Sequence, residues 1–403
     1  MKVVILAAGK GQRMGPLTHN RPKAMLPVLN RPIVEHLILN ARAAGLKEFV
    51  IVVNWKSETL KSYFGDGKDW GVNINWIDQA EVKGTAHAVA QVESHVKGDF
   101  VVLSGDTIVG SNTIEKLANA KENAIGVVKA KEPERYGVVY LQGSKISKIL
   151  EKPRVSTSSF INTGLYHFTQ EIFKAIKKTP LSQRKEYEIT SSIQSLIDRG
   201  ISTNATELTD WIDLTYPWDL LQANKKLFDT LEEGIKGEVE NFVTLKGKVI
   251  VGDGSKVMDG SYIEGPALIG KNCEVGPNCY IRPTTVLADN CKVGNACDVK
   301  NSILMKNTKV PHQSYVGDSI LGEGVNLGAG TKLANLRLDR TPVVARLNGE
   351  YVHTKLKKFG AVIGDGAQFG INSMTNPGTV IGANSLIGPG AIVYEELKEE
   401  SEI

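Results

Sequence analysis

The stretch that decides the fold runs from Val251 to Val310 and reads VGDGSKVMDGSYIEGPALIGKNCEVGPNCYIRPTTVLADNCKVGNACDVKNSILMKNTKV. Every sixth residue in it is aliphatic: Val251, Val257, Ile263, Ile269, Val275, Ile281, Leu287, Val293, Val299 and Met305. Small residues such as Ser261 and Cys273 stand two positions before an aliphatic one. Residues two apart on a strand share a face, so each repeat turns one small and one aliphatic side chain inward. This six-residue period predicts a parallel β-helix in which three short strands make one triangular coil.

The repeat continues towards the C-terminus with two interruptions. The same position recurs at Leu321, Leu327 and Leu333, and then at Ile363, Phe369, Thr375, Ile381, Ile387 and Val393. Its phase slips by four residues between Met305 and Leu321, and the pattern is lost from Asn335 to Gly360. A regular coil only stacks, whereas an irregular place frees side chains for chemistry. We therefore expect function at these interruptions, the first of which contains His312.

Composition restricts the classes of protein to consider. A chain of 403 residues, 41% hydrophobic and 23% charged, is typical of a soluble protein with two or three domains. The net charge of +4 and the absence of basic runs argue against a nucleic-acid partner. The longest apolar runs are too short for a membrane span, and the run from Val3 to Ala8 is too short for a signal peptide. We therefore expect a cytoplasmic protein.

The four cysteines follow the repeat. Cys273 and Cys291 are one full coil apart, as are Cys279 and Cys297, so each pair is expected to stack as small inward residues. Their spacing is unlike that of zinc ligands. Stacked strands about 4.8 Å apart could just allow a disulfide on distance, but a cytoplasmic location favours free thiols.

The N-terminal half alternates short apolar runs with amphipathic ones, which predicts a doubly wound, mostly parallel sheet up to Trp218. The predicted strands are Val3–Leu6, Phe49–Val53, Ile74–Ile77, Phe100–Leu103 and Ala124–Val128, and the predicted helices are Ile33–Ala44, Thr85–Val96 and Thr113–Lys121. A bridging helix is predicted from Trp218 to Glu233, ending at Gly234–Gly237. The predicted domains are therefore residues 1–235 and 236–403.

The loop after the first strand reads LAAGKGQRMG, from Leu6 to Gly15. Its glycines let backbone amides approach a phosphate, although Met14 breaks the GxGxxG pattern and no P-loop sequence follows. Arg13 and Lys23 could bring positive charge to a triphosphate, or could be solvated surface cations.

The stretch VVILAAGKGQRMGPLTHNRPKAMLPV, residues 3–28, resembles the signature of the sugar-1-phosphate nucleotidylyltransferases. Further motifs follow in that family's order: QAEVKGTAHA, LSGD, YGVV, EKP, INTG and WIDLTYPWDLL. The resemblance implies that Arg13 and Lys23 stabilise phosphate charge and that Asp106 and Asp213 hold one Mg²⁺. It implies nucleotide and sugar contacts at Leu6, Ala7, Ala8, Gly9, Gly11, Gln79, Gly84, Thr85, Gly105, Gly137, Glu151 and Asn162. Thr215 stands where many relatives have glycine.

Residues 306–339, KNTKVPHQSYVGDSILGEGVNLGAGTKLANLRLD, resemble the acetyltransferase region of the bifunctional enzymes that make UDP-N-acetylglucosamine. The resemblance implies that His312 is the catalytic base, a role that suits an imidazole with a near-neutral pKa. It implies acceptor-sugar contacts at Arg282, Lys300, Tyr315 and Asn326, and acetyl-CoA contacts at Ala329, Asn335 and Lys358. It also implies a left-handed β-helix after a Rossmann-like domain, and a homotrimer with CoA bound between coils.

The segment from Leu336 to Lys358 is longer than in bacterial relatives, and archaeal-type enzymes have similar insertions. Its lysines, Lys355, Lys357 and Lys358, could neutralise CoA phosphates or form a solvated turn. These two interpretations stay equally open.

The sequence thus predicts a bifunctional enzyme that acetylates glucosamine-1-phosphate with acetyl-CoA and then joins the product to UTP. One alternative is a single-activity nucleotidylyltransferase, using UTP or dTTP with glucose-1-phosphate or GTP with mannose-1-phosphate, whose coil serves oligomerisation or regulation. Another is a catalytically silent scaffold, which the presence of Arg13, Lys23 and Asp106 argues against. The choice between UTP and dTTP stays open.

Overall fold

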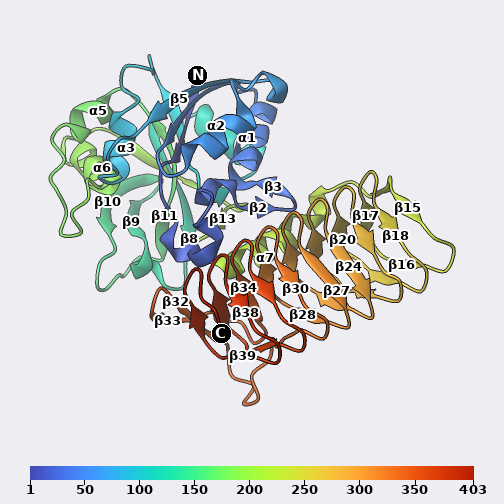
Figure 1. Cartoon of the computed structure of the whole chain (residues 1–403). Helices are drawn as coiled ribbons and strands as arrows, with labels where there is room; N and C mark the ends of the chain where they lie inside the picture. Colours follow the sequence, from blue (N-terminus) through green and yellow to red (C-terminus); the bar gives the residue numbers. More distant parts are fainter. The chain divides into compact units, whose positions relative to one another are not determined.

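The computed structural model describes all residues 1–403, which form two compact units (Figure 1). The first unit contains Met1–Lys10, Arg21–Met25 and Pro32–Asp213, and the second contains Gly11–Asn20, Leu26–Arg31 and Leu214–Ile403. Two short N-terminal segments therefore belong to the unit of the coil. The domain boundary predicted at residue 235 stays a prediction, because the second unit contains segments from both sides of that residue.

The first unit is built on a nine-stranded sheet with the order β5-β4-β1-β6-β11-β8-β12-β10-β9. Its strands are β1 (Lys2–Ala7), β4 (Glu48–Val53), β5 (Asn73–Asp78), β6 (Phe100–Ser104), β8 (Asn123–Lys129), β9 (Gly137–Gln142), β10 (Lys145–Glu151), β11 (Phe160–Phe168) and β12 (Thr203–Glu207). The strands β5, β4, β1 and β6 are parallel, as predicted. Strand β11 is antiparallel to both of its neighbours, β6 and β8, so the sheet is mixed.

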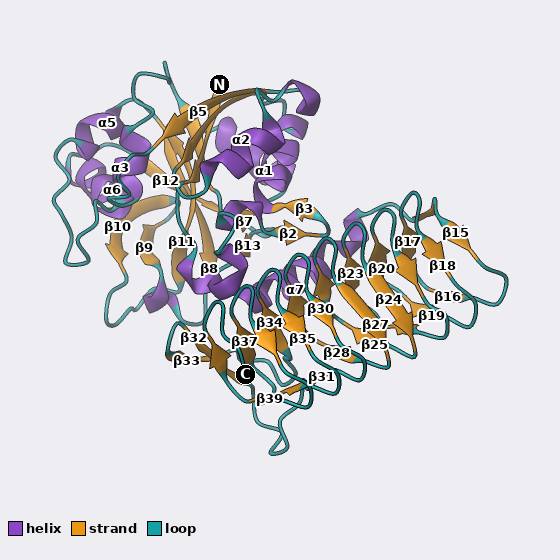
Figure 2. Cartoon of the chain, viewed as in Figure 1, coloured by secondary structure: helices purple, strands orange, loops and turns teal.

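Helices cover both faces of this sheet, so the unit is doubly wound (Figure 2). The helices are α1 (Ile33–Ala43), α2 (Ser57–Phe64), α3 (Thr85–Ala90), α4 (Ser111–Ala118), α5 (Glu171–Ile176) and α6 (Ile189–Asp198), with short 3₁₀ turns η2 (Lys23–Met25), η3 (Lys68–Trp70) and η4 (Pro133–Arg135). In β1, Val3 and Ile5 pack with α1, α2 and α4, while Val4 packs with α3, α5 and α6. Helix α3 ends at Ala90, well before the predicted Val96.

The second unit is a left-handed parallel β-helix made of three parallel sheets (Figure 1). Sheet 1 contains β14 (Gly234–Ile235), β17 (Val249–Val251), β20 (Ala267–Ile269), β23 (Thr285–Leu287), β26 (Ile303–Leu304), β29 (Ile320–Leu321), β34 (Ala361–Ile363), β37 (Thr379–Ile381) and β40 (Glu396–Leu397). Sheet 2 contains β15 (Glu238–Val239), β18 (Lys256–Val257), β21 (Glu274–Val275), β24 (Lys292–Asn295), β27 (Lys309–His312), β30 (Asn326–Leu327), β35 (Gln368–Phe369) and β38 (Leu386–Ile387). Sheet 3 contains β16 (Thr244–Lys246), β19 (Tyr262–Glu264), β22 (Tyr280–Ile281), β25 (Asp298–Lys300), β28 (Tyr315–Gly317), β31 (Lys332–Leu333), β36 (Met374–Thr375) and β39 (Ile392–Val393).

The inward aliphatic residues stack as the period predicts. Ile263 and Ile281 are register partners, as are Val275 and Val293, and all four lie in one buried core. The four cysteines lie in the same core as buried free thiols, which confirms their predicted packing role. Nowhere in the chain do three or more His, Cys, Asp or Glu side chains form a group that could hold a metal ion. None of the helices combines the length and apolar character needed to cross a membrane.

The phase slip has a simple cause. The spacing from Val299 to the next inward residue, Leu304, is five residues instead of six, and the spacing from Val316 to Leu321 is also five. Leu304, rather than Met305, is therefore the register partner of Leu287 and Leu321. His312 lies in strand β27, between these two shortened repeats and therefore inside the predicted phase slip.

The segment where the repeat is lost folds as a β-hairpin of β32 (Val344–Leu347) and β33 (Glu350–His353). Its turn residues Asn348 and Gly349 have φ values of 54° and 83°, which is the left-handed conformation of a two-residue hairpin turn. We call residues 344–353 the insertion hairpin.

The helix before the coil is shorter than predicted. It is α7 (Pro217–Leu227), followed by the 3₁₀ turn η5 (Phe228–Thr230), and β14 already begins at Gly234. Two segments close to the N-terminus also belong to this unit. One contains the 3₁₀ helix η1 (Gln12–Thr18), and in the other, which contains β2 (Pro27–Val28), the Asn30 side chain donates to the Leu287 carbonyl oxygen at 2.8 Å.

Candidate active sites

The first candidate site lies at the carboxyl end of β1, where a ligand site is expected in such sheets. Register pairs Leu6 with Ser104, and the Gly105 amide donates to the Leu6 carbonyl oxygen at 2.9 Å. A Cβ atom at Gly105 would lie 2.7 Å from that oxygen, so only glycine fits. The loops after β1 and β6 thus lie against each other, with the backbone of Leu6 to Gly9 at the sheet edge.

Two sequence-predicted residues are paired at this edge. Lys23 Nζ lies 2.8 Å from Asp106 Oδ2, and Ser104 donates its hydroxyl to Asp106 Oδ1 at 2.7 Å. Burial raises the pKa of Asp106, but the Lys23 ammonium and these hydrogen bonds outweigh burial, so the pKa lies below its ordinary value. The carboxylate is therefore charged at neutral pH and available to a cation.

Asp213 lies beside this pair. It belongs to β13 (Ile212–Asp213), which is antiparallel to β7 (Thr107–Ile108), and the register places Asp213 opposite Thr107. Its Oδ2 accepts a hydrogen bond from the Tyr136 hydroxyl at 3.0 Å. The structure thus places Asp213 opposite Thr107, the residue that follows Asp106 in the chain. Asp106 and Asp213 both carry carboxylate oxygens, which are ligands that Mg²⁺ prefers in proteins.

Gln79 is buried beside this edge, at the end of β5. Its side chain is 1% exposed, and its Nε2 lies 2.7 Å from His87 Nδ1, while its Oε1 has no hydrogen-bond partner. A buried acceptor without a partner is costly unless a ligand supplies the donor. Sequence reasoning assigned no role to His87, whose contribution is to orient this amide.

Gly84 and Thr85 are held by a loop that sequence reasoning missed. A Cβ atom at Gly84 would lie 2.6 Å from the Tyr187 carbonyl oxygen, and Gly84 has φ +107°, so glycine is required. The Thr85 hydroxyl accepts a hydrogen bond from the Ile189 amide at 3.0 Å.

Gly137, Glu151 and Asn162 also come together. A Cβ atom at Gly137 would lie 3.2 Å from Glu151 Oε2 and 3.4 Å from Asn162 Cβ. Glu151 is oriented by Arg184, at 3.1 Å from its Oε1, and by the Thr190 hydroxyl, at 3.2 Å from its Oε2. Both partners lie on the same missed segment, which reads RKEYEIT from Arg184 to Thr190, and no pattern in it pointed to them.

The remaining predicted residues of this site, Gly11 and Arg13, lie in the second unit. Arg13 is exposed on η1.

The second candidate site is on the outer face of sheet 3. On the strands of sheet 3, the residues that directly follow the inward aliphatic ones form one outward row. In this row Arg282, which comes directly after β22, is followed on the next coil by Lys300 of β25. The residue before each aliphatic forms another row, with Tyr262, Tyr280 and Asp298 on successive strands. Arg282 lies 3.5 Å from Asp298. Burial raises the pKa of the Asp298 carboxyl above its ordinary value, although the positive charge of Arg282 opposes this shift. Two neighbouring cations in one row suit a phosphate.

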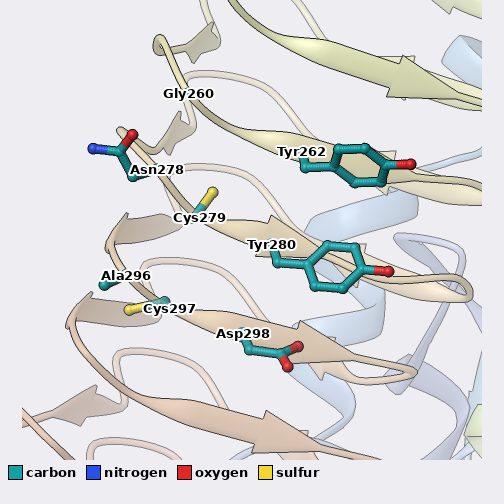
Figure 3. A pocket seen from close by; sticks show the side chains of 8 residues that line it. All are labelled: Gly260, Tyr262, Asn278, Cys279, Tyr280, Ala296, Cys297 and Asp298. Atoms are coloured by element: carbon teal, nitrogen blue, oxygen red, sulfur yellow. The ribbon is translucent and has the colours of Figure 1, made fainter.

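A shallow groove adjoins Asp298 (Figure 3). Tyr262, Tyr280 and Asp298 project from successive strands on one side of it, and Asn278 and Ala296 line its corner. The two tyrosine rings meet edge to face with centroids 5.4 Å apart. Asp298, which lines the groove, also contacts Arg282, one of the predicted acceptor residues.

Asp318 is the central residue of this site, and sequence reasoning missed it. Its buried carboxylate accepts hydrogen bonds from Asn301 Nδ2 at 2.7 Å and from Asn335 Nδ2, and it lies 3.2 Å from Lys300 Nζ. Asn335 also donates to the Tyr315 hydroxyl at 3.1 Å. Lys300, Tyr315 and Asn335, all predicted from the sequence, are thus fixed by one unpredicted carboxylate.

The two shortened repeats produce this arrangement. Asn301 and Asp318 occupy the shortened corners, with φ values of 44° and 48°, and Asn335 follows at the same corner of the next coil. Successive members are 17 residues apart, so their side chains stack in one column. Phe359 N then donates to the Asn335 carbonyl oxygen at 2.9 Å, where the chain returns from the insertion next to Lys358.

The other predicted residues lie on a different face. His312 ends β27 on sheet 2, its imidazole is exposed, and its carbonyl oxygen accepts from Gly330 N at 3.1 Å. Asn326 is on sheet 2 as the register partner of Lys309. The Ala329 carbonyl oxygen accepts a hydrogen bond from Asn372 N at 2.8 Å. One chain therefore presents the candidate acetyltransferase residues on two faces of its triangular coil.

Three families match this chain. Residues 2–230 match the nucleotidyl transferase family, residues 263–359 match the GMPPB C-terminal domain, and residues 360–394 match the bacterial transferase hexapeptide family of six repeats. A solved UDP-glucose pyrophosphorylase complexed with UDP-glucose aligns with 57% of this chain and 99% of its own, with a TM-score of 0.51 and 21% identity. That likeness shows the fold of the first unit.

Several full-length relatives are similar to the whole chain. Bifunctional protein GlmU of Methanocaldococcus jannaschii is 40% identical over 94% of this chain and 92% of its own. The protein of the same name from Methanococcus maripaludis is 39% identical over 100% of this chain and 96% of its own. A protein of Sulfurisphaera tokodaii, named bifunctional sugar-1-phosphate nucleotidylyltransferase/acetyltransferase, is 38% identical over 98% of both chains.

Proposed function

Because this chain belongs to the family of bifunctional sugar-1-phosphate nucleotidylyltransferase/acetyltransferases, we propose that it catalyses both reactions, one in each half of its sequence. The coil transfers the acetyl group of acetyl-CoA to the amine of glucosamine-1-phosphate. The N-terminal half then joins N-acetylglucosamine-1-phosphate to UTP and releases pyrophosphate, which gives UDP-N-acetylglucosamine. The proposal is supported by the full-length relatives, together with the pairing of Lys23 with Asp106 and of Lys300 with Asp318 in the two candidate sites.

Nucleotidyl transfer needs two anions to meet. A phosphate oxygen of the sugar attacks the α-phosphorus of UTP, and the bond to pyrophosphate breaks, so the protein must position both anions and offset their charge. Lys23 and Arg13 supply positive charge to the phosphates, and the nucleotide lies along Leu6, Ala7, Ala8, Gly9, Gly11 and Gly105. Asp106 and Asp213 would hold Mg²⁺, which when bound draws charge from the phosphate oxygens.

Base and sugar recognition follow from the other groups of the first site. The partnerless Oε1 of Gln79 fits the N3–H donor that uracil and thymine share, so UTP and dTTP are both suitable in this respect. Gly84 and Thr85 complete the base contacts. Gly137, Glu151 and Asn162, which meet around one point, hold the sugar.

Acetyl transfer requires an amine to lose its proton as it attacks the thioester. His312 accepts that proton, the amide bond forms, the thioester bond breaks, and CoA leaves as a thiol. Arg282 and Lys300 bind the acceptor phosphate, while Tyr315 and Asn326 bind the sugar. Ala329, Asn335 and Lys358 contact acetyl-CoA.

The candidate acetyltransferase residues lie on two faces of the coil, and this division bears on the oligomeric state. We propose a homotrimer, since sheet 2 of one copy and sheet 3 of another can together supply the full set of residues. Sedimentation should then give three subunits of 43.8 kDa each, whereas a monomer with full acetyl transfer would contradict the proposal. Four free thiols also suit a reducing compartment, so we place the enzyme in the cytoplasm.

The decisive experiment measures the thiol released from acetyl-CoA, with Ellman's reagent, in the presence of glucosamine-1-phosphate. Wild type should release CoA, and His312→Ala should not, while both still release pyrophosphate from UTP and N-acetylglucosamine-1-phosphate. The match of residues 263–359 to the GMPPB C-terminal domain favours the second candidate, a single-activity nucleotidylyltransferase. That candidate takes over if wild type releases pyrophosphate but no CoA.

A further inference from the structure

The segment that carries Arg13 is rigidly packed within the second unit. Met14 and Leu17 of η1 are fully buried, while Arg13 between Gln12 and Met14 is exposed. The Thr18 hydroxyl lies 3.2 Å from the carbonyl oxygens of Gly11 and Gly15, and Met14 N donates to Gly11 O at 2.8 Å. The backbone position of Arg13 is therefore set by whatever holds this turn.

The insertion hairpin holds it on both sides of Arg13. Asn348 Nδ2 donates to the Gln12 carbonyl oxygen at 2.9 Å. On the other side, a Cβ atom at Gly15 would lie 2.5 Å from Leu347 Cδ1, and Gly15 has φ +55°. Leu347 is 4% exposed, so its side chain is buried in this contact. The glycine of the signature loop is thus matched to a leucine of the hairpin.

The regular coil adds further contacts to the same segment. His19 Nδ1 lies 2.8 Å from Glu399 Oε1, and Asn20 Nδ2 donates to Asp365 Oδ2 at 3.3 Å. A Cβ atom at Gly364 would lie 2.9 Å from Pro16 Cβ. These contacts fix the base of the segment, whereas the hairpin fixes the part next to Arg13.

The hairpin is itself braced against the last coil. The amides of Asn348 and Gly349 donate to the Glu396 carboxylate at 2.6 and 2.8 Å. Arg346 and the Tyr351 hydroxyl contact Glu395 at 3.1 and 2.9 Å. The hairpin is therefore a fixed support and not a free arm.

We propose that the insertion hairpin is a positioning element for nucleotidyl transfer, which holds Arg13 in place through Asn348 and Leu347. This assigns the longest irregular segment of the coil to the reaction of the other half of the chain. The inference rests on the proposed role of Arg13 in binding phosphates. Both activities of one preparation can be measured, so acetyl transfer serves as the internal control.

The test compares Asn348→Gly with Asn348→Asp. Both residues accept the positive φ at position 348, so the turn is kept. Glycine removes one hydrogen bond, and kcat/KM for pyrophosphate release should fall about fivefold. Aspartate places a carboxylate against the Gln12 carbonyl oxygen and should cost at least about tenfold. CoA release should stay at the wild-type rate in both variants.

The control variant is Tyr351→Phe, which removes a hydrogen bond from the same hairpin on the side that faces Glu395. It should keep both activities. Wild-type nucleotidyl transfer in both Asn348 variants, alongside a defective Arg13→Ala variant, would overturn the role of the hairpin. Full activity in Arg13→Ala would instead overturn the proposed role of Arg13.

Discussion

Asn301 donates its side-chain amide to Asp318 at 2.7 Å, and the two residues stand 17 positions apart on successive coils. This bond exists because two neighbouring repeats are each one residue short. Elsewhere the coil advances by 18 residues per turn, as from Val257 to Val275. The arrangement of the candidate acetyltransferase site therefore follows from repeat length as well as from residue identity.

Replacing Asp318 by asparagine should weaken binding of the acceptor sugar phosphate. The variant loses the ion pair with Lys300 and sets an amide against the amides of Asn301 and Asn335. We expect KM for glucosamine-1-phosphate to rise about tenfold or more, because one partner of a largely buried charge pair is removed. CoA-release kinetics at varied acceptor concentration measure this. The control is Asp253→Asn at an exposed position of the coil, and equal KM values in the two variants would contradict the role of Asp318.

Replacing Lys23 by methionine should remove nucleotidyl transfer and spare acetyl transfer. The change keeps an unbranched side chain, one atom shorter, but removes the cation beside Asp106. We expect kcat for pyrophosphate release to fall about 100-fold or more, as when one group that stabilises transition-state charge is lost. Pyrophosphate and CoA release are measured on the same sample. A parallel loss of both activities would mean that Lys23 maintains the fold rather than the reaction.

Thr190→Val should act on the sugar phosphate of the nucleotidyl reaction. Valine keeps the shape of threonine but cannot donate to Glu151 Oε2. We expect KM for N-acetylglucosamine-1-phosphate to rise about fivefold, with KM for UTP unchanged. Thr179→Val is a matched control, because its buried hydroxyl contacts Ala175 and Ser192 instead. That variant should lose stability without a change in either KM, and identical kinetics for the two would contradict the assignment.

The four cysteines should not react with thiol reagents in the folded enzyme. Burial raises the pKa of Cys279 to about 11 and also raises the pKa of Cys297. The interaction of Cys273 with Cys291, together with burial, raises the pKa of Cys291. The same interaction lowers the pKa of Cys273, but that residue is only 1% exposed and its thiol donates to the Ala288 carbonyl oxygen at 3.1 Å, so a reagent cannot reach it in the folded protein. At pH 8 Ellman's reagent should therefore find no fast-reacting thiol in native protein and four after denaturation. A fast thiol in native protein would show that the coil opens.

Much of the architecture could be predicted from the sequence, because both halves have strong periodic signals. Inward residues such as Val275 and Val293 were identified correctly, since a six-residue period leaves no other assignment. Arg282 and Lys300 were also placed together, because they share one position of the repeat. The antiparallel strands β9 to β11 were missed, since no helices separate them and they gave no βαβ pattern.

The failures have physical reasons as well. A phase slip of four residues in the aliphatic pattern can arise from an insertion or from two single deletions, and the sequence does not distinguish them. Met305 satisfied the pattern as well as Leu304, so the shortened corner stayed hidden. Asp318 and Thr190 act on other side chains of the two sites rather than forming motifs of their own. Their roles depend on contacts 17 and 39 residues away.

The shortened repeats also suggest how such a site can arise during evolution. Leu287, Leu304 and Leu321 remain register partners across both deletions, so the hydrophobic core tolerates the loss of a corner residue. A deletion in a repeat scaffold thus moves one polar corner while every packed layer stays aligned. New chemistry can be gained in this fold by losing residues, without any substitution in the core.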